Sequence, residues 1–138
     1  MDVGAVPFAL AILIVAALVF VAIMITSKRK YRFDVEAYQS KFLAIENRLV
    51  KENPATFVTT VIDGDKLLDK AMMEMGVPGK TMGDRLKRSG SRFSDVNAVW
   101  RAHKLRNVLA HEDLEITYKQ AANALAIYKQ ALKDLGAI

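Results

Sequence analysis

The distribution of apolar residues divides the chain into an N-terminal hydrophobic run and a long amphipathic remainder. Positions 8–25 read FALAILIVAALVFVAIMI, and all 18 of them are apolar. Eighteen helical residues span about 27 Å, close to the hydrocarbon thickness of a bilayer. The residues before the run carry an acid and no Lys or Arg, whereas a cleaved signal peptide needs a basic region there. We therefore predict an uncleaved transmembrane anchor over 8–26.

After residue 33, apolar residues recur at steps of three and four, which is the spacing of amphipathic helices. Asp34 can cap a first helix, and Asn53-Pro54 ends it, because the residue before a proline avoids the helical region. The inward positions of this helix are Val35, Tyr38, Phe42, Ile45 and Leu49. A second helix follows up to Gly76, with Val58, Val61, Leu68, Met72 and Met75 inward; Gly64 weakens its middle.

Capping patterns mark the remaining helices. Thr81 with Asp84 has the form of a capping box for one short turn through Arg88. Ser94 is expected to cap a third helix that runs to about Ala110. Thr117 with Gln120 forms another capping box, and the last helix has a one-sided stripe: Tyr118, Ala121, Leu125, Tyr128, Leu132 and Leu135. No segment of the remainder alternates with period two for long. The predicted fold is all-α, with a four-helix bundle over 34–138.

The charges that flank the hydrophobic run predict its orientation. Lys28, Arg29, Lys30 and Arg32 follow it directly, whereas the preceding side carries only Asp2. Cytoplasmic flanks of membrane helices collect Lys and Arg. We expect residues 1–7 outside, 27–33 as a basic juxtamembrane linker, and 34–138 as a cytoplasmic domain of a single-pass membrane protein.

Composition limits the chemistry. The chain has no cysteine and two histidines, which excludes disulfides, Cys-based zinc sites, thiol nucleophiles and a His-rich metal site. We expect no metal and no cofactor. Residues 34–138 are nearly neutral, with 16 basic and 14 acidic residues, but 80–111 holds eight basic and two acidic ones. On charge alone, this basic part is more simply a solvated face than a binding surface.

Three patterns that suggest ligand binding fail on spacing. Gly79-Lys80-Thr81 resembles the end of a phosphate-binding loop, but the stretch lacks the required glycine spacing and preceding strand, so we interpret it as a helix connector. The acids Asp63, Asp65 and Asp69 lack the spacing of a calcium loop and are interpreted as a solvated helix face. His103 and His111 are eight residues apart with no third ligand.

One pattern survives, in the stretch from Trp100 to Glu112. Arg106 is followed by Asn107 and, after four intervening residues, by His111, at the end of the third predicted helix. This resembles the HEPN superfamily, whose signature is an Arg, four to six residues, then a His, with a polar residue after the Arg. The resemblance covers 34–138 and extends to small membrane-anchored bacterial proteins. Further similar stretches are Asp65-Lys66-Leu67-Leu68-Asp69, Thr81-Met82-Gly83-Asp84-Arg85-Leu86 and the terminal Ala-Leu-Lys-Asp-Leu-Gly.

The resemblance implies a metal-independent endoribonuclease or an RNA-binding module. Histidine exchanges protons near neutral pH and arginine matches phosphate oxygens, so His111 and Arg106 are the candidate catalytic residues. Asn107, His103 and Glu112 are candidate auxiliary or RNA-contacting residues. The alternative is a non-catalytic, membrane-tethered bundle for protein–protein interaction, in which Arg106 pairs with Glu112 or Asp113 and His111 caps a helix end.

The resemblance also implies a homodimer that brings two copies of the motif together. An independent reason is that Arg106 and His111 are five residues apart, or about 140° around an ideal helix, which aims them poorly at one phosphate. Helix unwinding near Ala110, or an arginine from a second chain, would solve this. The RNA target and any antitoxin partner stay unassigned. Trp100 is interpreted as a core anchor rather than as a platform for a base.

Overall fold

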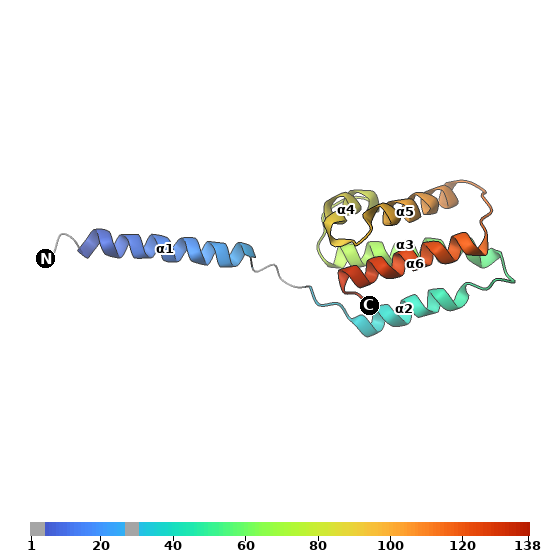
Figure 1. Ribbon diagram of the computed structural model, residues 1–138, viewed down its shortest axis with the longest axis horizontal. Helices are drawn as coiled ribbons and strands as arrows, with labels where there is room; N and C mark the ends of the chain where they lie inside the picture. The colour runs from blue at the N-terminus through green and yellow to red at the C-terminus, as the bar shows by residue number, and fades with distance from the viewer. Residues whose placement is uncertain (1–4, 27–30) are drawn as a thin grey trace. The chain divides into compact units, whose positions relative to one another are not determined.

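The computed structural model describes residues 5–26 and 31–138, and every regular element in these ranges is helical (Figure 1). The predicted all-α class is therefore confirmed for the described residues. The chain divides into two compact units, 1–32 and 33–138, and each is described by itself. The elements are α1 (Ala5–Thr26), α2 (Val35–Arg48), α3 (Ala55–Glu74), α4 (Met82–Ser89), the 3₁₀ turn η1 (Gly90–Arg92), α5 (Val96–His111) and α6 (Tyr118–Leu135).

The first unit contains one long apolar helix. Within α1, the segment Val6–Met24 has a mean hydropathy of 3.0, and none of it is buried. By length and composition it is able to cross a membrane, and a signal sequence near an N-terminus passes the same test. Of the basic residues predicted to flank an anchor, Lys28, Arg29 and Lys30 lie outside the described residues, and Arg32 is exposed.

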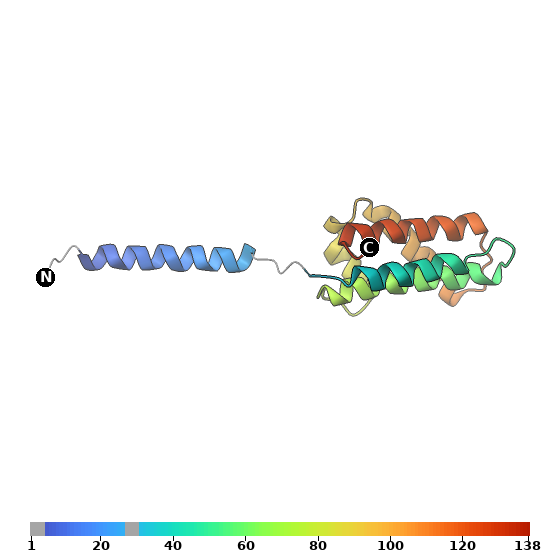
Figure 2. The same ribbon diagram turned by 90° about the horizontal axis from the view of Figure 1, so that it is seen from below.

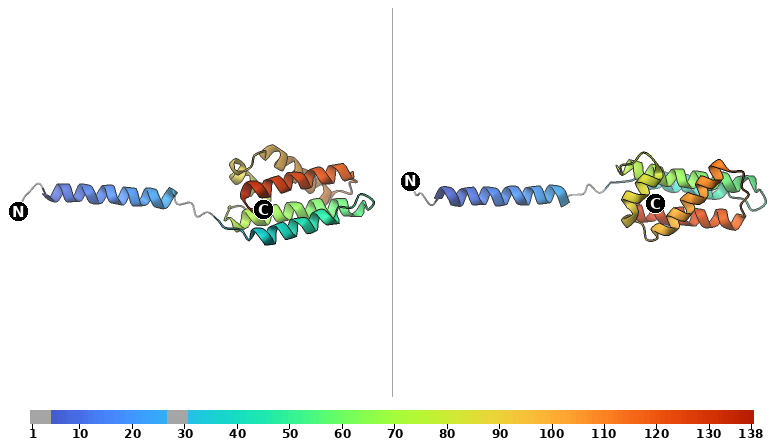
Figure 3. Two further views of the ribbon diagram at one scale, coloured as in Figure 1. Left: turned by 60° about the horizontal axis from the view of Figure 1, so that its bottom comes forward. Right: turned by 90° about the horizontal axis from the view of Figure 1, so that it is seen from above.

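In the second unit, α3 is the central helix and contacts α2, α4, α5 and α6. Helices α3 and α6 lie side by side, with α5 on one side of the pair and α2 on the other (Figure 1). Figure 2 shows α2 running alongside α3. Helix α4 and η1 lie at the end of the bundle where α5 begins (Figure 3). This helical bundle has one core, whose largest fully buried side chains include Tyr128, Phe42, Leu68, Met72, Leu86 and Leu132.

Side-chain caps begin four of these helices. The carboxylate of Asp34 accepts from the Ala37 N–H at 3.0 Å. Both predicted capping boxes are present, at the starts of α4 and α6. The expected cap of the third helix is wrong: Asp95, not Ser94, accepts from the Ala98 N–H, at 2.8 Å. The N–H and the hydroxyl of Ser94 instead donate to Asp134 of α6, both at 2.8 Å, which ties the start of α5 to the last helix.

Two boundary expectations also need correction. Helix α2 ends at Arg48, well before Pro54, because Leu49 leaves the helix with an extended backbone. Val35, which was expected inward, is 39% exposed at the first position of α2. The stretch 49–54 therefore forms the connection to α3 rather than a last helical turn.

Gly64, which the sequence marks only as a weak point of its helix, permits a close contact between α3 and α6. A Cβ at Gly64 would lie 2.7 Å from Cδ2 of Tyr128 and 3.0 Å from Cδ2 of Leu125. The missing side chain leaves the space that the ring of Tyr128 occupies next to the α3 backbone. The consequence for function is that the Tyr128 hydroxyl reaches the residue next to Gly64, which is Asp65.

Candidate functional site

A cleft of about 800 Å³ opens between α3, α4 and α5. The residues that α5 contributes come from one face along most of its length: Trp100, His103, Lys104, Arg106, Asn107 and His111. The opposite wall comes from the middle of α3, the loop before α4 and the first turns of α4. The two candidate catalytic residues thus line the same cleft, together with two of the three candidate auxiliary residues.

The cleft has a surplus of positive charge. It is lined by six Lys and Arg side chains and three Asp side chains. Each carboxylate is engaged by the protein: Asp65 with α5, Asp69 with Arg85, and Asp84 in the capping box of α4. Among the described residues, the lining lysines form no ion pair within 4.0 Å: Lys66, Lys80, Lys87 and Lys104. A cleft with unpaired cations and satisfied anions suits a polyanion.

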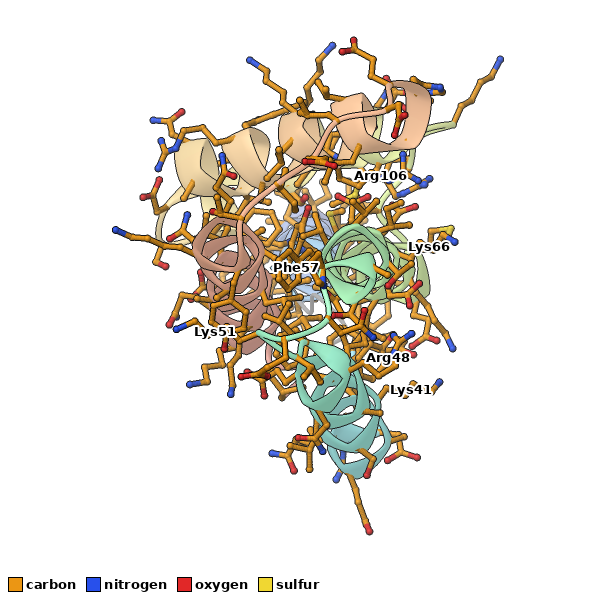
Figure 4. The ribbon with its side chains drawn as sticks, turned by 90° about the vertical axis from the view of Figure 1, so that its right-hand side faces the viewer. Lys41, Arg48, Lys51, Phe57, Lys66 and Arg106 are labelled. Carbon is orange, nitrogen blue, oxygen red and sulfur yellow. The ribbon has the colours of Figure 1, made fainter. Side chains whose placement is uncertain are left out.

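Asp65 of α3 lies at the floor of the cleft and connects three helices. It is 2% exposed. Its Oδ1 accepts from Nδ1 of His103 at 2.9 Å and from the Tyr128 hydroxyl at 3.2 Å. Its Oδ2 lies 3.3 Å from Nε of Arg106, which makes an ion pair. Nε itself is buried and has no aligned hydrogen bond among the described residues. Figure 4 shows Arg106 reaching from α5 toward α3.

Asn107 completes a closed ring of polar contacts that runs through Asp65, His103, Asn107 and Arg106. Nη1 of Arg106 donates to Oδ1 of Asn107 at 3.0 Å, and Nδ2 of Asn107 lies 3.2 Å from Nε2 of His103. If Nδ1 of His103 carries the proton that Asp65 accepts, Nε2 is the acceptor for Asn107, and both nitrogens of this imidazole have partners. Burial, the charge of Asp65 and its hydrogen bond raise the pKa of Tyr128, so that its hydroxyl stays a donor.

A second buried ion pair fixes the α4 wall of the cleft. Arg85 donates to both carboxylate oxygens of Asp69, from Nε at 2.6 Å and from Nη2 at 2.8 Å. Its Nη1 donates to the Gly79 carbonyl at 2.6 Å. The hydrogen bond to Asp69 raises the pKa of Arg85 above its ordinary value. All three guanidinium nitrogens of Arg85 therefore donate to the protein and hold the loop before α4 against α3. The lysines and Arg106 are the lining cations that could bind a ligand.

His111 is the last residue of α5 and is exposed. It forms no hydrogen bond or ion pair with the part of the chain that the structure describes. The unwinding considered near Ala110 is absent, because α5 stays α-helical through His111. Glu112 follows as the C-cap; its N–H donates to the Val108 carbonyl at 2.8 Å, and its side chain does not line the cleft.

The structure corrects two expectations about charged residues. The acids of α3 are not one solvated face: Asp65 is buried, Asp69 pairs with Arg85, and only Asp63 lies at the surface, where it pairs with Arg48 at 2.6 Å. Arg106 pairs with Asp65 rather than with Glu112 or Asp113. Trp100 is half-buried and packs against the core, yet it also lines the cleft.

Sequence reasoning missed Asp65, Tyr128 and the lining lysines as members of the site. A signal for Asp65 was present, since it lies four residues after Val61 and three before Leu68, on the apolar face of α3. An acid at such a position is buried and must find partners.

No group of three or more His, Asp or Glu side chains that could hold a metal ion occurs within residues 5–26 and 31–138. Comparison of the chain with protein-family models, with curated proteins and with solved structures gave no match.

Proposed function

We propose that the unit 33–138 is a HEPN-like domain that binds RNA in this cleft and cuts it without a metal ion. The observation that carries the proposal is the placement of Arg106 and His111 on one cleft beside lysines with no protein partner. A ribonuclease of this kind needs a fixed cation for the phosphate and a histidine free to accept a proton.

Arg106 is held in a way that suits phosphate binding. Asp65 lies beside Nε of the guanidinium and Asn107 accepts from Nη1, while Nη2 has no hydrogen-bond partner among the described residues. A guanidinium positioned by two neighbours donates to phosphate oxygens with little loss of side-chain freedom. Because Asp65 is buried, Arg106 also keeps its orientation when the cleft is empty.

His111 would act as the general base. It removes the proton of a ribose 2′-hydroxyl, and the 2′-oxygen forms a bond to the adjacent phosphorus. The bond from phosphorus to the 5′-oxygen breaks, and the leaving oxygen takes a proton from water. The products are a 2′,3′-cyclic phosphate and a 5′-hydroxyl. His103 and Asn107 act as positioning residues, since both belong to the ring around Asp65.

We propose further that α1 is an uncleaved membrane anchor with the domain on the cytoplasmic side. Its length and hydropathy support a span, and the positive charges of Lys28, Arg29, Lys30 and Arg32 support the orientation. A reporter that works only in the cytoplasm, fused after Ile138, is expected to be active. Activity of a periplasm-only reporter at the same place would contradict this.

The ribonuclease is tested with the full chain in detergent micelles and single-stranded RNA in the presence of EDTA. Cleavage with cyclic phosphate ends is expected, and Arg106→Ala and His111→Ala are each expected to abolish it. Arg101→Ala is the matched control, since Arg101 is exposed on α5 and does not line the cleft. Equal cleavage by all variants would assign the activity to a contaminant. No cleavage, with capture of an acidic protein through the lysines, would favour an interaction module.

A further inference from the structure

The single tryptophan of the chain, Trp100, lines the cleft at the end opposite His111 along α5. Trp100 lies seven residues before Asn107, about 10 Å along the helix axis at the rise of an α-helix. Lys104, one turn later, and Lys80, from the loop before α4, line the same cleft. The cleft thus places an aromatic ring beside two lysines that form no ion pair with the described residues, about 10 Å along α5 from Asn107.

From this arrangement we infer that Trp100 stacks on an unpaired base of a single-stranded RNA, while Lys80 and Lys104 bind the phosphates next to that base. The inference rests on the proposed RNA cleft but adds a separate subsite and a substrate class. Proteins that bind single strands combine a basic groove with aromatic side chains on which bases stack.

Trp100 contacts both the core and the residues around Asp65. Its neighbours Val99 and Ala102 are buried, whereas Trp100 is half-buried and borders the cleft. Its ring meets that of His103 edge to face, with centroids 6.1 Å apart and an interplanar angle of 68°. His103 is itself fixed by Asp65. The indole N–H makes no hydrogen bond with the described residues, so it is free to donate to a ligand.

Gly83 keeps a side chain away from the indole. A Cβ at Gly83 would lie 3.7 Å from Cη2 and 3.8 Å from Cζ3 of Trp100, and a longer side chain there would cover the six-membered ring. Gly83 stands at the second position of α4, in a helix capped by Thr81, and its φ is not in the left-handed region. The backbone therefore does not require glycine here.

The substrate class follows from the stacking. A duplex keeps its bases paired and stacked on each other, whereas a single strand or a hairpin loop can splay one base onto the indole. Loss of the aromatic ring is expected to weaken binding of a single strand roughly fivefold to a hundredfold, the range found for one base–aromatic stack. Binding of a polyanion without bases is expected to be unaffected.

The test uses the fluorescence of Trp100 in the full chain, in detergent micelles, since no other tryptophan contributes. The probe is a 2′-O-methyl oligoribonucleotide, which binds but cannot be cut because it lacks the free 2′-hydroxyl. We expect the single strand to quench the fluorescence, and the same sequence in a duplex, or inorganic polyphosphate, to leave it nearly unchanged. Binding itself is followed separately by the anisotropy of a labelled oligonucleotide.

Two pairs of variants separate stacking from folding. Trp100→Phe is expected to retain most of the affinity and Trp100→Ala to lose it, with melting temperature measured for each. Gly83→Leu keeps Trp100 but covers it, so quenching and affinity should fall; Ser91→Leu, exposed outside the cleft, is the control. Oligonucleotide binding without quenching, or equal quenching by polyphosphate, would overturn the subsite. If the oligonucleotide quenches Trp100 but ordinary RNA is not cut, the stacking subsite is upheld and the ribonuclease activity is refuted. If no oligonucleotide binds, both the subsite and the RNA-binding cleft are refuted.

Discussion

Asp65 of α3 and His103 of α5 are 38 residues apart in the chain and share a buried hydrogen bond of 2.9 Å. The same carboxylate neutralises Arg106 and accepts from Tyr128. Two helices that pack on α3 from different sides are thus joined through one acid. The site and the core are not independent, and substitutions at this point should change both stability and phosphate binding.

Asp65→Ala is expected to lower the free energy of unfolding by about 2–4 kcal/mol, because it leaves a buried imidazole and a buried hydroxyl without their acceptor and a partly buried guanidinium without its counter-ion. Chemical denaturation of the full chain in micelles, followed by circular dichroism, measures this. Asp63→Ala is the control on the same helix. Its ion pair with Arg48 is largely exposed, so a loss of no more than about 1 kcal/mol is expected. Equal losses would show that Asp65 carries no special role.

Gly64→Ala is expected to destabilise the bundle by about 1–3 kcal/mol, although alanine is the better helix former. The added methyl group would approach Tyr128 to 2.7 Å, and the buried ring has no room to withdraw. Gly83→Ala is the comparison, because its nearest neighbour would be 3.7 Å away. The melting temperatures of the two variants should shift in opposite directions or differ from each other by several degrees. A stabilised Gly64→Ala protein would contradict the close contact of α3 with α6.

The capping box of α4 should make part of the stability depend on acid pH. Hydrogen bonds from the Thr81 N–H and hydroxyl lower the pKa of Asp84, outweighing a small opposing effect of burial, with further help from the Lys80 N–H. A carboxyl whose folded pKa is depressed stabilises the protein above its unfolded pKa, near 4, and this contribution is lost as the pH falls through the folded value. Asp84→Ala should therefore lower the melting temperature at neutral pH but hardly at all at strongly acidic pH. A difference that persists at acidic pH would refute the assignment.

The proposed homodimer can be tested by cross-linking, because the chain has no native cysteine. Arg101→Cys and Lys104→Cys place a thiol on exposed positions of α5 and should give cross-linked dimers in intact membranes under mild oxidation. His103, an obvious choice from sequence alone, is unsuitable because it is buried in the ring around Asp65. Lys51→Cys, in the exposed connection after α2, should not cross-link. Equal yields at all three positions would indicate random collision, and no yield at any would favour a monomer.

The helices with one-sided apolar stripes and local caps were predictable from sequence. Thr81 with Asp84, and Thr117 with Gln120, form boxes whose partners lie three residues apart, so local spacing was sufficient. The start of α5 was not predictable in this way. Ser94 and Asp95 are both good capping residues, and the choice between them depends on Asp134, which lies 40 residues later and engages Ser94.

The motif residues of α5 were found from their spacing, but their surroundings were not. Asp65 lies among other acids on a helix with a polar face, so local charge suggested solvent exposure. Its burial requires both α5 and α6 to pack on α3, which no local pattern contains. Arg106 and His111 diverge around the helix only at the level of their Cα positions. The long arginine side chain reaches the cleft floor, while His111 borders the same cleft from the end of α5.

The direction of the hydrogen bonds in the ring makes the two histidines of this chain chemically unequal. Nε2 of His103 lies 3.2 Å from Nδ2 of Asn107 and its Nδ1 lies 2.9 Å from Oδ1 of Asp65, so both of its ring nitrogens have protein partners. His111, by contrast, forms no hydrogen bond with the described residues, so its imidazole is open to an external electrophile. An acylating reagent such as diethyl pyrocarbonate should therefore modify a single imidazole in the folded chain, so that one covalent label reports occupancy of the cleft.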